Sequence, residues 1–300
     1  MSEFDLQHIE TPVIVIERDE EPVETVENNG QQKVSRLTTW LRRLFGLVCV
    51  SAVVLATACG FWIWRYYHHI GVPVSTSPAQ NIEKLKAPLK SEAAEVVLTS
   101  DSILGVALDF YAIHGLHATI EMVEPDTADA SVFLYCRSAD HTPDHKYLGS
   151  LVIEGKELQS DRSRLGYMGM ADGRMVIGIS RSDKVKDYVR ERGGSFFRQF
   201  ILVSDGVIPA RYYLRGKVER RAIGRMDDTL YYIATRNKET MYDFADALSE
   251  YGFTDAIYIT GGADYCFYRT RDSQRHDIGN VDEYPHLKWV GDVPWLVFRK

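Results

Sequence analysis

The chain has 300 residues, 45% of them hydrophobic and 26% charged, which is typical of a globular protein with one or two domains. Its formal net charge is −7, but residues 1–32 alone hold nine acidic residues and one basic residue, so the remainder is nearly neutral. The sequence shows no basic patch, and we therefore expect no nucleic acid among its partners.

The acidic residues 1–32 form the first segment. Apart from a short run from Val13 to Ile16 they have no apolar periodicity, so we expect them to be disordered. The run could be a linear motif for a cytoplasmic protein partner, although a solvated tail is the favoured interpretation. Together with the basic flank that follows, the predicted cytoplasmic segment covers residues 1–43.

Residues 44–64, LFGLVCVSAVVLATACGFWIW, contain no charged side chain. About 20 apolar residues in a helix span the hydrocarbon core of a bilayer, so we predict one transmembrane helix here. Four basic residues precede it and one follows closely: Lys33, Arg36, Arg42 and Arg43, then Arg65. This asymmetry predicts a cytoplasmic amino terminus and an extracytoplasmic carboxyl-terminal part, which is periplasmic if the source is bacterial.

Residues 65–92 contain Pro73, Pro78 and Pro88 and are predicted to be a linker. From residue 93 to residue 300 the pattern is that of one extracytoplasmic domain. Short β-type runs occur at 103–111, 117–123, 131–136 and 149–155. Xaa-Gly pairs between apolar runs predict three tight turns, at Glu154-Gly155, Asp172-Gly173 and Asp205-Gly206.

The second half of this domain contains an internal echo. Residues 173–206 read as strand, helix and strand, and residues 229–262 repeat that order. A helix between two apolar strands predicts a right-handed crossover with parallel pairing. We therefore expect an α/β (α+β) domain with a mixed sheet and crossover helices. The echo could reflect a duplication or two units of a common type.

The later helix of the echo has the clearest signals. Met241, Phe244, Ala245 and Leu248 follow the i, i+3, i+4, i+7 spacing of one apolar face. Thr240 with Asp243 resembles a capping box at its start, and Gly252 suits its end.

Two stretches could carry function at strand ends. Gly261 and Gly262 follow the apolar run of residues 255–260 and would let a ligand or a neighbouring backbone approach closely, although a glycine turn explains them equally well. Arg220 and Arg221 are adjacent, so on a strand they face opposite sides. We expect one to be exposed and the other to point toward a cleft, where it could bind a carboxylate or a phosphate or form a structural salt bridge.

The segment from residue 137 to residue 147 is a third candidate because it holds two His-Asp pairs: Asp140 with His141, and Asp144 with His145. Such pairs suit metal binding or acid–base chemistry. Pro143 breaks any helix that would align the histidines, so a polar loop is the favoured interpretation.

Four cysteines are present, two of them, Cys49 and Cys59, in the apolar run. Cys136 and Cys266 lie in strand-like segments of the globular part. They could pair in an extracytoplasmic domain, although free buried thiols are the favoured interpretation.

From about Leu148 to Tyr268, the chain resembles the phosphodiester glycosidase family, the relatives of the mannose 6-phosphate uncovering enzyme. The pieces that match are GSLVIEGKEL, FILVSDGVI, RRAIGRMDDTLYYIATRN, ETMYDFADAL and YGFTDAIYITGG, in the order and spacing of that family. The resemblance implies a mixed α/β fold and hydrolysis of a sugar–phosphate diester.

The resemblance also implies the roles of individual residues. The family's arginine falls on Arg221 and its two glycines on Gly261 and Gly262, but its aspartate falls on Thr260. The family's Asn-Gly signature has no counterpart near YCRSAD, residues 135–140. A threonine supplies no carboxylate for proton transfer or metal binding, so the resemblance implies an altered site.

Two functions from different classes follow as hypotheses. In the first, the domain hydrolyses a sugar–phosphate diester or a related envelope glycan, Arg221 binds phosphate, and Asp140, His141 or Asp264 replaces the missing acid–base group. In the second, the domain is a catalytically inactive relative that binds a glycan or a protein in the altered cleft. The sequence leaves open the substrate and any requirement for a divalent cation.

Overall fold

A computed structural model describes residues 29–68, 75–88, 92–138, 146–209, 216–262, 264–279 and 293–300. The chain divides into two compact units, Met1–Gly60 and Phe61–Lys300, and we describe each by itself. The helices are α1 (Asn29–His68), α2 (Pro78–Lys86), α3 (Lys184–Glu191) and α4 (Met241–Tyr251). The strands are β1 (Glu95–Ile103), β2 (Val106–His114), β3 (His117–Glu121), β4 (Val132–Arg137), β5 (Leu151–Ile153), β6 (Lys156–Gln159), β7 (Gly166–Ala171), β8 (Arg174–Ile179), β9 (Ser195–Gln199), β10 (Ile201–Ser204), β11 (Arg220–Met226), β12 (Thr229–Thr235), β13 (Asp255–Gly261), β14 (Cys266–Arg269), β15 (Arg275–Ile278) and β16 (Trp295–Arg299).

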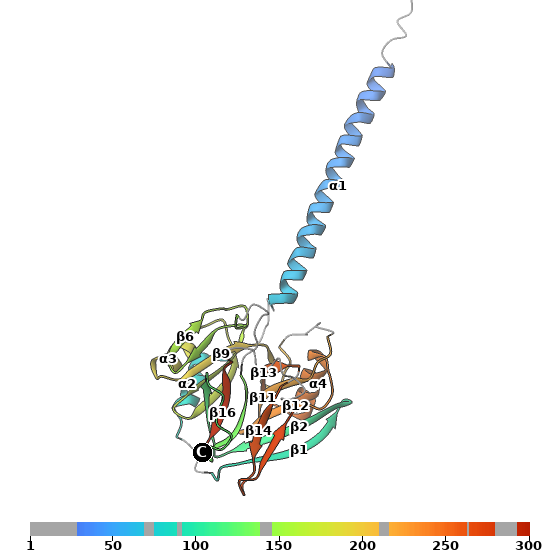
Figure 1. Ribbon diagram of the computed structural model, residues 1–300. Helices are drawn as coiled ribbons and strands as arrows, with labels where there is room; N and C mark the ends of the chain where they lie inside the picture. The colour runs from blue at the N-terminus through green and yellow to red at the C-terminus, as the bar shows by residue number, and fades with distance from the viewer. Residues whose placement is uncertain are drawn as a thin grey trace, which may run out of the picture. The chain divides into compact units, whose positions relative to one another are not determined.

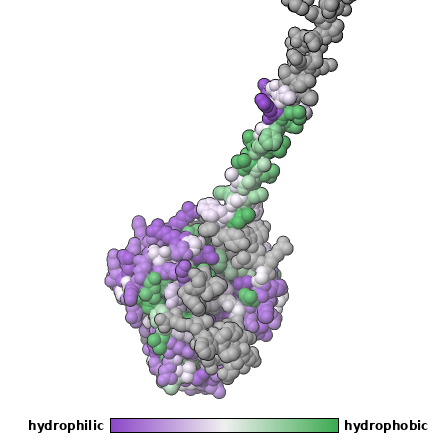
Figure 2. Space-filling model, turned by 45° about the horizontal axis from the view of Figure 1, so that its top comes forward, coloured by the Kyte–Doolittle hydropathy of each residue, from purple (hydrophilic) through white to green (hydrophobic). Residues whose placement is uncertain are grey.

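Helix α1 contains the predicted membrane span. Its stretch from Thr38 to Trp64 is long and apolar enough to cross a bilayer, and none of it is buried within the protein. Figure 2 shows apolar side chains along this helix, whereas most of the visible coloured surface of the globular part is hydrophilic. By length and composition this helix could cross a bilayer, so the chain has the features of a single-pass membrane protein.

The described residues of the globular part form three β-sheets (Figure 1). Sheet A has the strand order β1-β2-β12-β11-β13-β10, sheet B has the order β15-β14-β4-β16-β3, and sheet C has the order β6-β5-β9-β7-β8. One large apolar core takes side chains from all three sheets, among them Tyr111 of sheet A, Leu134 of sheet B and Met168 of sheet C. The three sheets therefore depend on one another for burial, and the α/β (α+β) class expected from the sequence is confirmed.

The helices pack on the outer faces of two sheets. The apolar face of α4 contacts sheet A, where Phe244 and Leu248 lie fully buried against Phe110 and Ile233. Helices α2 and α3 contact sheet C through Leu85 and Val189 in the same way. Burying a side chain of this size contributes about 2–3 kcal/mol each, so these helices are integral to the fold.

Helix α4 begins and ends where the sequence predicts, with a cap at Thr240 and a stop at Gly252. The backbone N–H of Asp243 donates to Thr240 Oγ1 at 3.0 Å, and Gly252 ends the helix in the left-handed conformation with φ of 107°. The expected turns at Glu154-Gly155, Asp172-Gly173 and Asp205-Gly206 are also present, each with positive φ at both residues.

The expected parallel pairing is wrong, because every strand pairing in the described residues is antiparallel. Helix α3 connects β8 to β9, but β7 lies between these two strands. In the same way α4 connects β12 to β13 across β11. The crossover strands do run in the same direction, since both are antiparallel to the strand that separates them. The echo is thus a β-β-α-β unit that occurs twice.

Three element boundaries also differ from the sequence interpretation. Residues 103–111 are not one strand, because Leu104 and Gly105 form a tight turn between β1 and β2 with φ of 51° and 83°. The run 197–206 divides at Phe200 into β9 of sheet C and β10 of sheet A. The expected linker 65–92 contains α2, whose Asn81 side chain donates to Tyr167 Oη at 2.8 Å.

Candidate functional site

The two adjacent arginines of β11 face opposite sides, as expected, but neither is exposed. Arg220 and Arg221 are each only 6% exposed. Arg220 turns toward the α4 side, where its Nε donates to the Glu239 carbonyl at 3.0 Å. Arg221 turns toward the core shared by the three sheets. The expectation of one solvent-exposed arginine is wrong because the turn before α4 covers that face.

The end of β13 is held against β11 by backbone contacts. Gly261 pairs with Arg220 in the ladder, and the N–H of Gly262 donates to the Glu219 carbonyl at 2.9 Å. A Cβ on Gly261 would lie 2.1 Å from Tyr258 Oη. Gly261 therefore admits a close neighbour from its own chain, whereas Gly262, with φ of 83°, is the residue that a glycine turn requires.

Four polar side chains meet beyond this strand end, and we call Arg137, Arg221, Thr260 and Asp264 the strand-end cluster. The Thr260 hydroxyl donates to Asp264 Oδ2 at 3.2 Å. The Arg137 Nε lies 3.2 Å from Asp264 Oδ1, which also accepts the N–H of Tyr265 at 2.9 Å. Arg221 Nη1 donates to the carbonyl of Gly262 at 2.6 Å.

The cluster is closed to solvent. Thr260 and Asp264 are each 5% exposed, and the bonds above occupy both carboxylate oxygens of Asp264. Because β4, which carries Arg137, belongs to sheet B while β11 and β13 belong to sheet A, the cluster joins the two sheets. As it stands, the arrangement braces the sheets and offers no accessible anion site.

The electrostatics of Asp264 and Arg221 are set by burial and by each other. Burial raises the pKa of Asp264, and although Arg221 and Arg137 oppose this effect, the pKa stays above its usual value. Burial disfavours the charge of Arg221, but Tyr232 and Asp264 outweigh it and keep the arginine pKa above its usual range. The cluster therefore contains a permanent cation beside a carboxyl that holds its proton more tightly than usual.

Sequence analysis missed one member of this cluster, Arg137, and one residue close to it, Tyr232. Arg137 is the last residue of the buried strand β4, and Tyr232 of β12 accepts a hydrogen bond from Cys266 Sγ at 3.4 Å. A charged residue ending an otherwise apolar run was the signal for Arg137. Nothing in the local sequence singles out Tyr232, since its role depends on strand pairing.

Two of the predicted site residues, Asp140 and His141, lie outside the described residues, as do Asp144 and His145. Among the described residues, no group of three or more His, Cys, Asp or Glu side chains could hold a metal ion.

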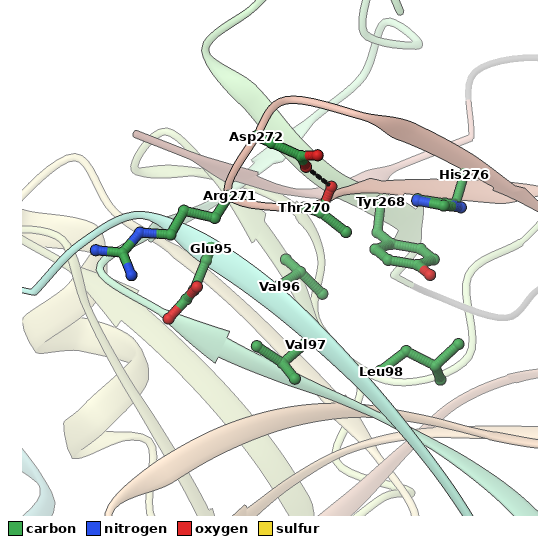
Figure 3. A pocket seen from close by; sticks show the side chains of 9 residues that line it. All are labelled: Glu95, Val96, Val97, Leu98, Tyr268, Thr270, Arg271, Asp272 and His276. Carbon is green, nitrogen blue, oxygen red and sulfur yellow. Dashed lines mark hydrogen bonds between the residues drawn. The ribbon is translucent and has the colours of Figure 1, made fainter.

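An open groove lies at a different place, between the edge strand β1 and the β14–β15 hairpin (Figure 3). Its volume is about 590 Å³, and its lining residues are Glu95, Val96, Val97, Leu98, Tyr268, Thr270, Arg271, Asp272 and His276. Val97 and Leu98 are 42% and 40% exposed and give the groove an apolar part. No sequence motif indicated this groove, because its walls are 170 residues apart in the chain.

The polar side chains of the groove divide into two kinds. The His276 ring stacks on Tyr268 with centroids 4.9 Å apart, and the Thr270 hydroxyl donates to Asp272, which lowers the pKa of that carboxyl. Glu95 and Arg271 make no side-chain hydrogen bond or ion pair with any residue that the structure describes. Their charges are therefore the ones available to a ligand.

Comparisons with solved structures find similar chains at low sequence identity. No protein-family model and no curated protein matches the chain. Among solved structures, the catalytic domain of zebrafish N-acetylglucosamine-1-phosphodiester alpha-N-acetylglucosaminidase, auto-inhibited by its pro-peptide, aligns with 12% identity and a TM-score of 0.46 over 71% of this chain and 85% of that one. A hypothetical protein from Synechocystis aligns with 9% identity and a TM-score of 0.48 over 69% of this chain and 62% of that one. We transfer no residue role from these likenesses.

Proposed function

We propose that this chain is a membrane-anchored, non-hydrolytic domain that binds a saccharide in the groove between β1 and the β14–β15 hairpin. Its amino terminus lies in the cytoplasm and its globular part outside, in line with the basic residues that precede the apolar span. The strand-end cluster, which the family resemblance makes the expected catalytic place, has a structural role in this proposal.

The observation that carries the proposal is the closure of the strand-end cluster. A hydrolase needs a donor that reaches the substrate phosphate and a carboxyl within hydrogen-bonding distance of the leaving oxygen. Arg221 instead donates to Gly262 of its own chain, and Asp264 accepts from Thr260 and Tyr265. Hydrolysis at the cluster would require these hydrogen bonds to break, whereas binding in the groove would leave them in place.

The chemistry of the groove suits a saccharide. Sugar hydroxyls bind to carboxylates and guanidinium groups, and the C–H faces of the ring pack on apolar side chains. Glu95 and Arg271 supply the charged partners, while Val97 and Leu98 supply the apolar surface. A volume of about 590 Å³ lies within the range of small-ligand sites.

The test is a glycan-array screen of the full chain in detergent, followed by calorimetric titration of the saccharides that bind. Glu95→Gln and Arg271→Ala should each weaken binding about tenfold or more, because a hydrogen bond to a charged group contributes about 1.5–3 kcal/mol. Glu250→Gln and Lys238→Ala are the matched controls, since both residues are exposed and lie outside the groove.

Two outcomes of the screen would contradict saccharide binding. In the first, no saccharide binds and a protein partner is captured through Glu95 and Arg271 instead. In the second, saccharides bind but the groove variants and the control variants have the same affinity.

One observation favours hydrolysis as a second candidate function. Burial raises the pKa of Asp264, which lies beside Arg137, and a carboxyl with a raised pKa is a candidate for general-acid catalysis. The purified chain should therefore be assayed on a panel of sugar–phosphate diesters with and without divalent cations. We expect no turnover; turnover that Asp264→Asn abolishes in a folded protein would establish the hydrolase instead.

A further inference from the structure

Cys136 of β4 and Cys266 of β14 are buried on neighbouring strands of sheet B. In the ladder between β14 and β4, Phe267 is opposite Tyr135 and Tyr268 is opposite Leu134. Continuing this antiparallel register by one residue places Cys266 directly opposite Cys136. Both cysteines contribute to the core shared by the three sheets, so their side chains project from the same face.

The register brings the two thiols within reach of a covalent bond. Directly opposite residues of antiparallel strands have Cα atoms about 4.5 or 5.5 Å apart, depending on the type of pair. Disulfides span Cα separations of about 4.4–6.8 Å, so either type of pair fits. In this structure both cysteines are free, and Cys266 directs its Sγ at Tyr232.

We propose that Cys136 and Cys266 form a cross-strand disulfide in the mature protein. The inference rests on the proposed extracytoplasmic location, where disulfides form and persist, and it does not depend on the groove. Because the thiols are 0% and 1% exposed in the folded chain, the bond must form before the core closes.

The oxidant is an external disulfide, either of a thiol–disulfide oxidoreductase or of a small molecule such as oxidised glutathione. One cysteine thiolate attacks a sulfur of that disulfide, which forms a mixed disulfide and releases the first external thiol. The thiolate of the other cysteine then attacks the mixed disulfide and releases the second external thiol. The two cysteines lose two electrons and two protons in total, and the external disulfide gains them.

The bond would reinforce a weakly paired part of the fold. Only two residue pairs connect β14 to β4 in the described ladder, and the bond would close a loop of about 130 residues, a length at which loop closure stabilises strongly. It would also hold β4 beside β14 close to the ion pair between Arg137, at the end of β4, and Asp264, in the connection from β13 to β14.

The test is differential thiol labelling of the full chain extracted from membranes. Free thiols are blocked with light N-ethylmaleimide under denaturing conditions, and the protein is then reduced and labelled with heavy N-ethylmaleimide. We expect the heavy label on Cys136 and Cys266 and the light label on Cys49 and Cys59. Light label on Cys136 and Cys266 in the native protein, or a disulfide of either with another partner, would overturn the proposal.

Two variants sharpen this result. In Cys136→Ala, Cys266 should change from heavy to light label, whereas in the control Cys49→Ala the heavy label should stay on both. Adding a reductant during unfolding should lower the melting midpoint of the wild type by roughly 5–15 °C and leave that of Cys136→Ala unchanged. A reporter that places the domain outside the cytoplasm while both thiols remain light would refute the disulfide alone and leave the orientation intact.

Discussion

At the scale of single residues, Asp264 links two sheets through three contacts. It accepts hydrogen bonds from Thr260 and from the N–H of Tyr265, and it forms an ion pair with Arg137. Thr260 and Tyr265 belong to the same segment as Asp264, whereas Arg137 comes from β4 of the other sheet, so the ion pair is the contact that links the two sheets. Thr260 acts here as a hydrogen-bond donor, a role that an aspartate at the same position would reverse.

We predict that Thr260→Asp destabilises the protein by about 2–4 kcal/mol at pH 7, because a second carboxylate would be buried beside Asp264. Folded-state pKa values raised above about 3.9, the value in the unfolded chain, give stability that is present at low pH and lost as pH rises. The deficit relative to the wild type should therefore shrink between pH 7 and pH 5, as measured by urea unfolding.

The control for this prediction is Thr260→Val, which removes the hydroxyl and adds no charge. It should cost about 1–2 kcal/mol, with the same deficit at both pH values. If Thr260→Asp were as stable as the wild type at pH 7, the strand end would be open to solvent and the structural role of the cluster would be refuted.

Sequence analysis identified residues of this cluster but did not predict that they are buried. Sequence analysis points to Arg221 on one strand and to Thr260 and Asp264 at the end of another, and in the structure these residues lie close together. Their burial could not be predicted, because it depends on β4 and Arg137 of another sheet, more than 120 residues away from Asp264. The residue types of the cluster can be read from local sequence, but its solvent exposure depends on how the two sheets pack.

At the scale of elements, the two β-β-α-β units show where pattern reading succeeds. The spacing of Met241, Phe244 and Leu248 and the cap at Thr240 predicted α4 correctly, since these signals are local. The partners of β12 and β13 were predicted wrongly. A crossover helix brings two strands into the same direction, but it does not determine whether a third strand, here β11, lies between them.

The end of β13 gives a prediction about its two glycines. Gly261→Ala should cost about 2–3 kcal/mol, because its Cβ would lie 2.1 Å from Tyr258 Oη and 3.2 Å from the Glu219 carbonyl. Gly262→Ala should cost only about 1 kcal/mol, because its Cβ meets open space and the penalty is the positive φ of 83°. Urea unfolding measures the loss of stability in both variants. A larger loss for Gly262→Ala than for Gly261→Ala would mean that this turn is packed differently.

At the scale of the whole molecule, the orientation of the membrane helix decides which compartment the globular part occupies. A single apolar span and the unequal distribution of basic residues around it are the evidence. We predict that an alkaline phosphatase reporter fused after Lys300 is active, since that enzyme requires an oxidising compartment, and that the same reporter fused before Met1 is inactive.

Replacing the four preceding bases, Lys33, Arg36, Arg42 and Arg43, with glutamine should reduce the reporter activity after Lys300, because the positive charges hold their end in the cytoplasm. Replacing Lys156 and Lys238, which are exposed in the globular part, serves as the control and should leave the activity unchanged. An active reporter at the amino terminus would reverse the orientation and remove the compartment on which the disulfide depends.

The pairing of β3 with β16, two strands far apart in the sequence, has a consequence for how the protein folds. Residues 117–121 find their partner in β16, at residues 295–299, and the central strand β2 pairs with β12, which begins more than 110 residues later. During synthesis the early strands therefore emerge long before the strands that complete their sheets. Such non-local pairing makes folding slow, and the apolar β2 and β4 stay exposed throughout that interval. We therefore expect the yield of the folded globular part to depend on the kinetics of folding as well as on the stability of the finished fold.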